Sequence, residues 1–521
     1  MARRAFKITT LSIAGGVSAA LVLMLTLGTL AAVFWRADGL GNITAADWDA
    51  LRFTLMQAFL SALLSIALAI PVARALARRR FLGRSILIAL MGAPFILPSI
   101  VAVLGLVAVF GQSGLIGRAL VFLGFEPFSI YGLHGILLAH VFFNLPLATR
   151  LILQGWLAIP GEHFRLAQTL RFRPLSTLRV IEFPMLREIV PGAFTVIFVL
   201  CTTSFAVALA LGAGPKSTTI ELAIYQAFRF DFDLGSAALL GLIQLGICAL
   251  AAAAALWVRV PQMAQGGLDR VVAMPPTGAI SRAADTLFIV FAAAFLLLPL
   301  GSILVRGLFE IAELPPVVWH SALRSCAMAL GSALLTIALS LPLAWLAASN
   351  KRAGLWAEGA GFLTIAASPL VMGTGLFILL YGFVNPVDWA LAITVFVNAA
   401  MALPFAMRAL VPAISAAKAQ FGPLAQSLDL RGWAAWRWLW WPRLRGALGF
   451  SAGLSGALSM GDLGVIALFA DPDRASLPLQ MYRLMAAYRM DQAAGAALLL
   501  LGLSLAIFWL FDRGGRVNAE A

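Results

Sequence analysis

The sequence predicts an all-α polytopic membrane protein with about 12 transmembrane helices. The 521-residue chain is 62% hydrophobic, only 12% of its residues are charged, and its mean hydropathy is +0.95. A soluble chain carries roughly 25% charged residues. Apolar segments long enough to cross a hydrocarbon core of ~30 Å recur along the whole sequence. The charged residues are mostly basic, and they gather in short clusters between these segments.

Twelve spans can be placed from the apolar segments. The first is too long for the apolar region of a secretory signal peptide, so we expect it to remain as a helix. Basic clusters such as Arg78, Arg79 and Arg80 fall in alternate loops, and such clusters mark cytoplasmic loops. This bias predicts that both termini are cytoplasmic and accounts for the net charge of +14 without nucleic acid. The spans centre within 10–34, 52–74, 86–110, 131–149, 189–211, 235–258, 284–308, 321–348, 359–383, 387–407, 447–469 and 493–511.

The chain contains an internal repeat. The run Ser61–Pro71 recurs almost unchanged as Ser332–Pro342, at an offset of 271 residues. After one extracytoplasmic loop the offset is 258, as the match of Pro146 with Pro404 shows. Matches of proline and arginine are the informative ones, because proline is costly inside helices and charge is costly in lipid.

This repeat predicts two six-helix units, 1–260 and 283–521, joined by a polar cytoplasmic linker over 261–282. Because six is an even number, the two units insert with the same orientation. Parallel repeats around an axis along the membrane normal enclose a shared pathway.

Each unit has one long amphipathic cytoplasmic segment between its fourth and fifth spans. A short helix is expected to open after Pro160 in the first segment and after Pro423 in the second. Two leucines four residues apart share one face of each helix, Leu166 with Leu170 and Leu424 with Leu428. Such a helix can lie on lipid headgroups or dock into a groove on a partner. Its occurrence twice, at the same topological place, favours docking on a two-fold partner.

The two segments resemble the coupling loops of type I ABC importer permeases, whose pattern is E-A-A, three residues, Gly, nine residues and I-x-L-P. Ala167 and Ala425 match the second alanine of that pattern. The pattern's Glu is replaced by Arg165 and Pro423, and its Gly by Arg171 and Asp429. The endings Ile181-x-Phe183-Pro184 and Leu439-x-Trp441-Pro442 fit. The coupling residues that the resemblance implies are Glu162, Leu166, Ala167, Gln168, Leu170, Arg171, Leu424, Ala425, Gln426, Leu428 and Asp429.

Within this family the chain is most similar to the bacterial thiamine permeases, over nearly its whole length. The segments that carry this similarity are Ala139–Pro146, Thr219–Gln226 and Ser459–Leu468. The resemblance implies a MetI-like permease fold in the bacterial inner membrane. It also implies two copies of a separate ABC ATPase subunit and a periplasmic binding protein that delivers thiamine or its phosphate esters. A ferric-iron importer permease is the alternative within the same class.

Asp462 is the one acid placed well inside a predicted span. An acid at the membrane centre costs on the order of 2.5–3.5 kcal/mol, which invites a functional interpretation. It could attract a cationic cargo in the pathway, or it could be hydrated or paired with Arg324. A proton-coupled secondary transporter would need more such residues, and it would give the cytoplasmic segments no purpose.

No metal, cofactor or nucleotide site is expected in this chain. Cys201, Cys248 and Cys326 fall in apolar segments without metal-ligand spacing, and they are interpreted as buried small hydrophobes. The segment Gly212–Thr218 superficially resembles a phosphate-binding loop. It places proline between glycine and lysine, and the topology puts it outside the cell. ATP hydrolysis is therefore expected in a separate chain, and this chain is predicted to be a transport subunit rather than an enzyme.

Overall fold

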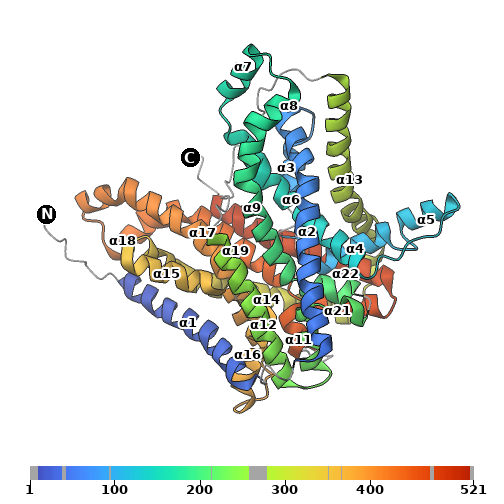
Figure 1. Cartoon of the computed structure of the whole chain (residues 1–521). Coiled ribbons are helices and arrows are strands. Elements are labelled where there is room, and N and C mark those ends of the chain that lie inside the picture. Colours follow the sequence, from blue (N-terminus) through green and yellow to red (C-terminus); the bar gives the residue numbers. More distant parts are fainter. Residues whose placement is uncertain are drawn as a thin grey trace. The chain divides into compact units, whose positions relative to one another are not determined.

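The computed structural model describes residues 10–37, 43–92, 96–212, 214–256, 278–349, 351–364, 367–469 and 474–516. Within these ranges the chain forms helices joined by turns, and no strand occurs (Figure 1). The predicted linker 261–282 lies outside the described residues except for its last five positions.

Eleven helical segments among the described residues are long and apolar enough to cross a membrane, which confirms a multi-pass membrane protein. They are Ile13–Arg36, Ala45–Arg78, Ser99–Phe122, Leu133–Ala158, Leu175–Thr202, Leu234–Ala251, Ala279–Glu313, Pro316–Ala347, Ala390–Ser427, Gly432–Phe469 and Met490–Gly515.

The span predicted over 359–383 is divided between α15 (Lys351–Leu363) and α16 (Pro369–Tyr381). Ser368 caps α16 by accepting a hydrogen bond from the Val371 N–H, and Pro369 occupies its first turn. Proline suits that position because its missing N–H has no helical partner there. In the first half, Pro98 is the N-cap residue directly before α4 (Ser99–Phe110).

One compact unit, unit 2, comprises residues 43–223 and 246–309. Its centre is formed by α2 (Ala45–Arg78), α6 (Leu133–Ala158) and α9 (Phe183–Thr202), which pack against one another (Figure 1). α13 (Ala279–Glu310) belongs to the same unit, where the rings of Phe110 and Phe295 lie 6.2 Å apart.

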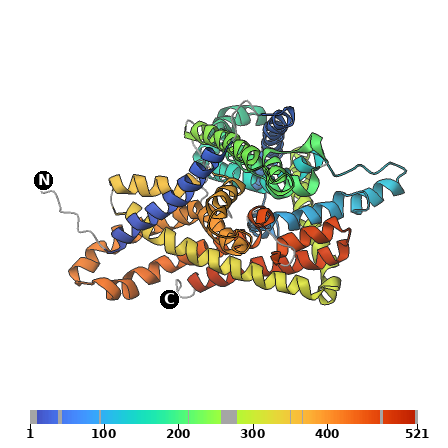
Figure 2. The ribbon, with the colours of Figure 1, turned by 90° about the horizontal axis from the view of Figure 1, so that it is seen from below.

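The other compact unit, unit 1, gathers α14 (Pro316–Ala347), α17 (Ala390–Ser427), α19 (Trp441–Met460) and α22 (Met490–Arg516). α1 (Thr10–Arg36) packs along α14 and α16 in this unit, where Figure 2 shows the blue helix beside yellow ones. The remaining helices of the chain are α3 (Arg84–Leu90), α5 (Leu115–Phe122), α7 (Gly161–Thr169), α8 (Pro174–Thr177), η3 (Leu178–Glu182), α10 (Phe205–Leu211), η4 (Pro215–Ser217), α11 (Ile220–Arg229), α12 (Leu234–Leu256), η5 (Ile311–Glu313), α18 (Gly432–Ala435), η7 (Trp436–Trp440), α20 (Gly464–Phe469) and α21 (Leu477–Ala486).

The compact units group the helices differently from the sequence repeat, whose boundaries stay a prediction. The first helix of each sequence half, α1 or α13, belongs to the unit that holds most of the other half. Both packings use a glycine at nearly the same place in the repeat, one residue away from the offset of 271. A Cβ on Gly105 would lie 2.7 Å from the Pro299 carbonyl oxygen, and one on Gly375 would lie 2.5 Å from that of Thr29. Only glycine lets the helix backbones approach this closely.

Replacing Gly375 by alanine should therefore destabilise the chain. The new methyl group overpacks the contact with α1, at about 1–3 kcal/mol. Gly502→Ala is the matched control, because Gly502 lies inside α22 with nothing within 4 Å of the added Cβ. We expect Gly502→Ala to be neutral or stabilising, since alanine favours helix by about 1 kcal/mol. The melting temperatures of the two purified variants in detergent compare the effects, and equal values would argue against the close packing of α1 on α16.

Candidate functional site

The first of the two segments that the sequence assigns to the cytoplasmic side forms the short helix α7, as predicted. Pro160 is its N-cap residue, and the helix ends at Thr169. Phe164 and Ala167 are buried, whereas Leu166 and Leu170 are 58% and 57% exposed. The apolar stripe of α7 is therefore an outward-facing surface, available to a partner.

The second of these two segments differs from the prediction, because no new helix opens after Pro423. α17 runs without a break from Ala390 to Ser427 and contains Pro423 near its end. In the first half Ile159-Pro160 breaks the helix, because a residue before proline avoids the helical conformation. The equivalent stretch 416–420 is made of Ala, Lys and Gln, which are good helix formers. Leu424 and Leu428 are nevertheless 48% and 60% exposed, as their counterparts are.

α7 and α17 end in the same hydrogen-bonded cap. The Phe172 N–H donates to the Ala167 oxygen at 2.9 Å, and the Arg171 N–H donates to Gln168 at 3.0 Å. These two bonds form a Schellman motif, whose penultimate residue adopts the left-handed conformation.

At offset 258 the same bonds recur from the Leu430 N–H to Ala425 at 2.9 Å and from the Asp429 N–H to Gln426 at 3.3 Å. Arg171 has a φ of 51° and Asp429 a φ of 45°. These are the two positions at which the permease pattern has glycine, so the cap explains that glycine. The chain keeps the turn with other residues.

This cap gives a prediction about Arg171 and Asp429. Glycine at both positions should leave the melting temperature unchanged or raise it, because glycine adopts positive φ without a steric penalty. Valine at both should lower it by several degrees, because a β-branched residue tolerates the left-handed conformation less well than the arginine and aspartate now present. Thermal unfolding of the purified double variants compares them. Similar melting temperatures for both pairs would mean that the left-handed turn is not retained.

The other predicted coupling residues lie in the same two segments, and two of them are buried rather than at the surface. Glu162 is in the exposed first turn of α7, and Gln168 and Gln426 are exposed. Ala425 is buried, as Ala167 is. Beyond the cap, each segment forms one short helix and then one turn of π-helix, called a π-turn below. These π-turns are η3, which precedes α9, and η7, which precedes α19. π-turns are rare and are frequent at functional sites. Nothing in the sequence pattern pointed to them.

Asp462 lies in the short break between α19 and α20. The backbone N–H groups of Gly464, Val465 and Ile466, and the side chain of Asn398, interact with its carboxylate. Its Oδ2 atom is buried and makes no hydrogen bond to the described residues. Arg324, the alternative partner, donates instead to the Ala475 carbonyl at 3.3 Å. Asp462 therefore caps α20 and leaves one carboxylate oxygen without a protein partner among the described residues.

Buried hydrogen bonds join equivalent helices in each half. In unit 2, Ser61 Oγ lies 3.0 Å from His140 Nδ1, between α2 and α6. In unit 1, Ser459 Oγ lies 2.9 Å from Ser332 Oγ and accepts from Asn398 at 3.1 Å. Polar contacts of this kind hold membrane helices together. None of the three cysteines forms a disulfide; Cys201 and Cys248 are buried as predicted, whereas Cys326 is only partly buried.

Known proteins similar to this chain include thiamine transport permeases. No protein-family model matches the chain. The thiamine transport system permease protein ThiP of Brucella abortus is 40% identical over 531 residues, covering 98% of this chain and 97% of the relative. That of Escherichia coli is 39% identical over 516 residues, covering 96% of each. That of Haemophilus influenzae is 36% identical over 477 residues, covering 88% of this chain and 87% of the relative.

Proposed function

The chain belongs to the family of thiamine transport permeases, and from this premise we propose that it is the membrane-spanning subunit of an ATP-binding-cassette importer for thiamine and its phosphate esters. The observation that carries the proposal is the identity of about 40% over 98% of the chain. That similarity extends across both cytoplasmic helices and both copies of the repeat.

The partners follow from the two cytoplasmic surfaces. Each ends in the same cap and presents a pair of half-exposed leucines, so each can fill a groove on one ATPase subunit. Two equivalent surfaces favour two copies of that subunit. The nucleotide is bound and hydrolysed there, and this chain carries no cofactor of its own.

The location and the cargo complete the proposal. The basic loops favour a bacterial inner membrane protein with both termini cytoplasmic. A periplasmic binding protein delivers the cargo from the other side. Thiamine carries a positive charge, and the Asp462 carboxylate, one oxygen of which makes no hydrogen bond to the described residues, offers a negative charge of opposite sign inside unit 1.

Uptake measured in cells that lack the chain tests this function. Labelled thiamine should accumulate only when the chain is supplied together with its ATPase and binding protein, and ferric iron should enter equally well in either case. Loss of iron uptake with normal thiamine uptake would assign the chain to the other importer class.

A further inference from the structure

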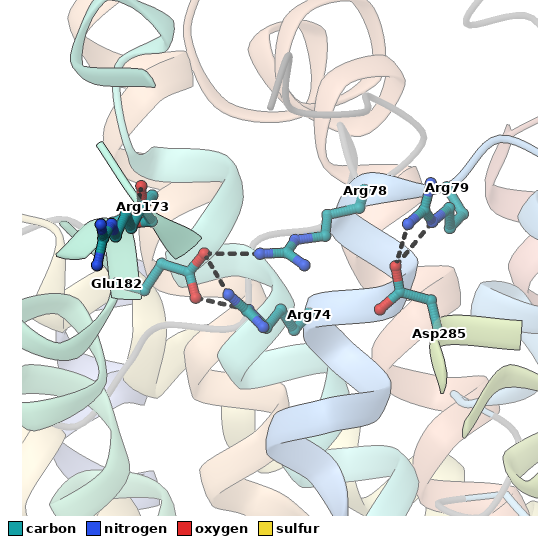
Figure 3. A network of polar contacts seen from close by, with 7 residues as sticks. Arg74, Arg78, Arg79, Arg173, Glu182 and Asp285 are labelled. Atoms are coloured by element: carbon teal, nitrogen blue, oxygen red, sulfur yellow. Dashed lines mark hydrogen bonds and ion pairs between the residues drawn. The ribbon is translucent and has the colours of Figure 1, made fainter. Parts of the chain in front are cut away.

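Glu182 is a fully buried acid at the cytoplasmic side of unit 2. The Arg74 guanidinium donates hydrogen bonds to both carboxylate oxygens of Glu182, from Nε to Oε2 at 2.6 Å and from Nη2 to Oε1 at 3.1 Å. Arg78 Nη2 donates to the same carboxylate at 3.1 Å. Figure 3 shows the two arginines converging on it from one helix. A buried carboxylate is tolerated only when it is paired and hydrogen-bonded in this way.

This ion pair connects two structural elements, the π-turn η3 and the end of α2. Glu182 is the last residue of the π-turn η3, which links the cytoplasmic segment of α7 to α9. Arg74 and Arg78 lie in the last two turns of α2. The ion pair therefore links the end of the cytoplasmic segment that adjoins α9 to the end of the long membrane helix α2.

The same place in unit 1 holds a contact of different chemistry. At the repeat offsets, Trp345 stands for Arg74 and Trp440 for Glu182. Their rings meet edge to face, with centroids 5.1 Å apart and planes at 90°. Lys418 places its ammonium 4.1 Å from the Trp345 ring centre and donates to the Trp345 carbonyl oxygen at 3.2 Å. Two pairs of side chains of different chemistry thus join equivalent elements, α2 with η3 in the first half and α14 with η7 in the second.

We propose that these pairs are the joints through which each cytoplasmic helix moves its membrane unit, and that Arg74 and Glu182 are positioning residues for coupling in the first half. This rests on the proposed function, in which the cytoplasmic helices receive the movement of the ATPase. Because the first joint is ionic and the second aromatic, removal of the Glu182 charge loosens only the first.

A neighbouring ion pair supplies the control. Arg79 Nη2 lies 2.5 Å from Asp285 Oδ2 and joins α2 to α13 at the same end of the helix (Figure 3). The pair does not include a residue of the π-turn. Asp285→Asn therefore removes a comparable ionic contact while leaving the hydrogen bonds of Glu182 to Arg74 and Arg78 in place.

Hydrogen exchange of the purified chain in detergent tests the joint without reference to any cargo. In Glu182→Gln the backbone amides of residues 175–182 should exchange at least about tenfold faster than in the unchanged chain. In Asp285→Asn the same amides should keep their rates. Unchanged rates in Glu182→Gln overturn the proposal. So does equal acceleration across all of unit 2 in both variants, because Glu182 would then be only a general stabiliser.

A graft from the second half tests the coupling role. The triple variant Arg74→Trp, Arg78→Ser, Glu182→Trp copies the residues that unit 1 has at these positions, Ser349 included. Glu182→Gln should lower the ratio of thiamine imported to ATP hydrolysed about tenfold. The triple variant should restore this ratio and also the slow hydrogen exchange. An unchanged ratio in Glu182→Gln would overturn the coupling role. If the unchanged chain imports no thiamine, the proposed cargo fails, while the exchange rates still decide whether the joint exists.

Discussion

Replacing Leu166 and Leu428 together by aspartate is expected to abolish thiamine uptake while the chain still inserts into the membrane. Both leucines are more than half exposed, so their loss costs the fold little. In an interface each buried leucine anchor is worth about 2 kcal/mol. Loss of both would weaken the association with the ATPase by about a thousandfold.

The measurement has two parts. Labelled thiamine uptake is compared in cells that carry equal amounts of the variant and the unchanged chain, and co-purification with the ATPase is scored in detergent. Leu166→Met with Leu428→Met is the matched control, because methionine keeps an apolar side chain of similar volume. Normal uptake by the aspartate double variant would show that these surfaces do not couple transport to ATP.

Replacing Asp462 by asparagine is expected to raise the thiamine concentration for half-maximal uptake by about tenfold. Loss of one partly buried negative charge opposite a cation costs on the order of 1–2 kcal/mol. Asparagine caps helices about as well as aspartate, so the start of α20 should persist. The melting temperature should therefore change little while the uptake curve shifts.

Asp462→Ala separates the cap from the charge. Alanine removes both, so this variant should also lower the melting temperature, since a lost cap costs about 1 kcal/mol. Concentration-dependent uptake and thermal unfolding of both variants make the comparison. If asparagine leaves uptake unchanged at every thiamine concentration, Asp462 serves the helix and not the cargo.

The sequence predicts those features that depend on local composition. Apolar length and basic clusters identify the membrane helices, and Pro98 and Pro369 mark the helix starts that the structure shows. The exposure of Leu166 and Leu428 follows from their place outside the apolar segments.

Other features depend on neighbours that are distant in sequence. The ion pair of Glu182 joins residues 108 positions apart, and its motif position is an unspecified residue between Ile181 and Phe183. The association of α1 with the second half depends on backbone contact at Gly375, which a repeat in sequence does not reveal. Pro423 is a local signal that misleads, because the flanking helix formers keep α17 continuous.

Transport by the purified assembly tests the central claim most directly. The chain, its ATPase and its binding protein are reconstituted in vesicles without an ion gradient, and labelled thiamine is followed as it crosses the membrane. The proposed function predicts accumulation that requires ATP on the ATPase side and stops when hydrolysis is blocked. Accumulation driven by a proton gradient in the absence of ATP would contradict it and identify a secondary transporter.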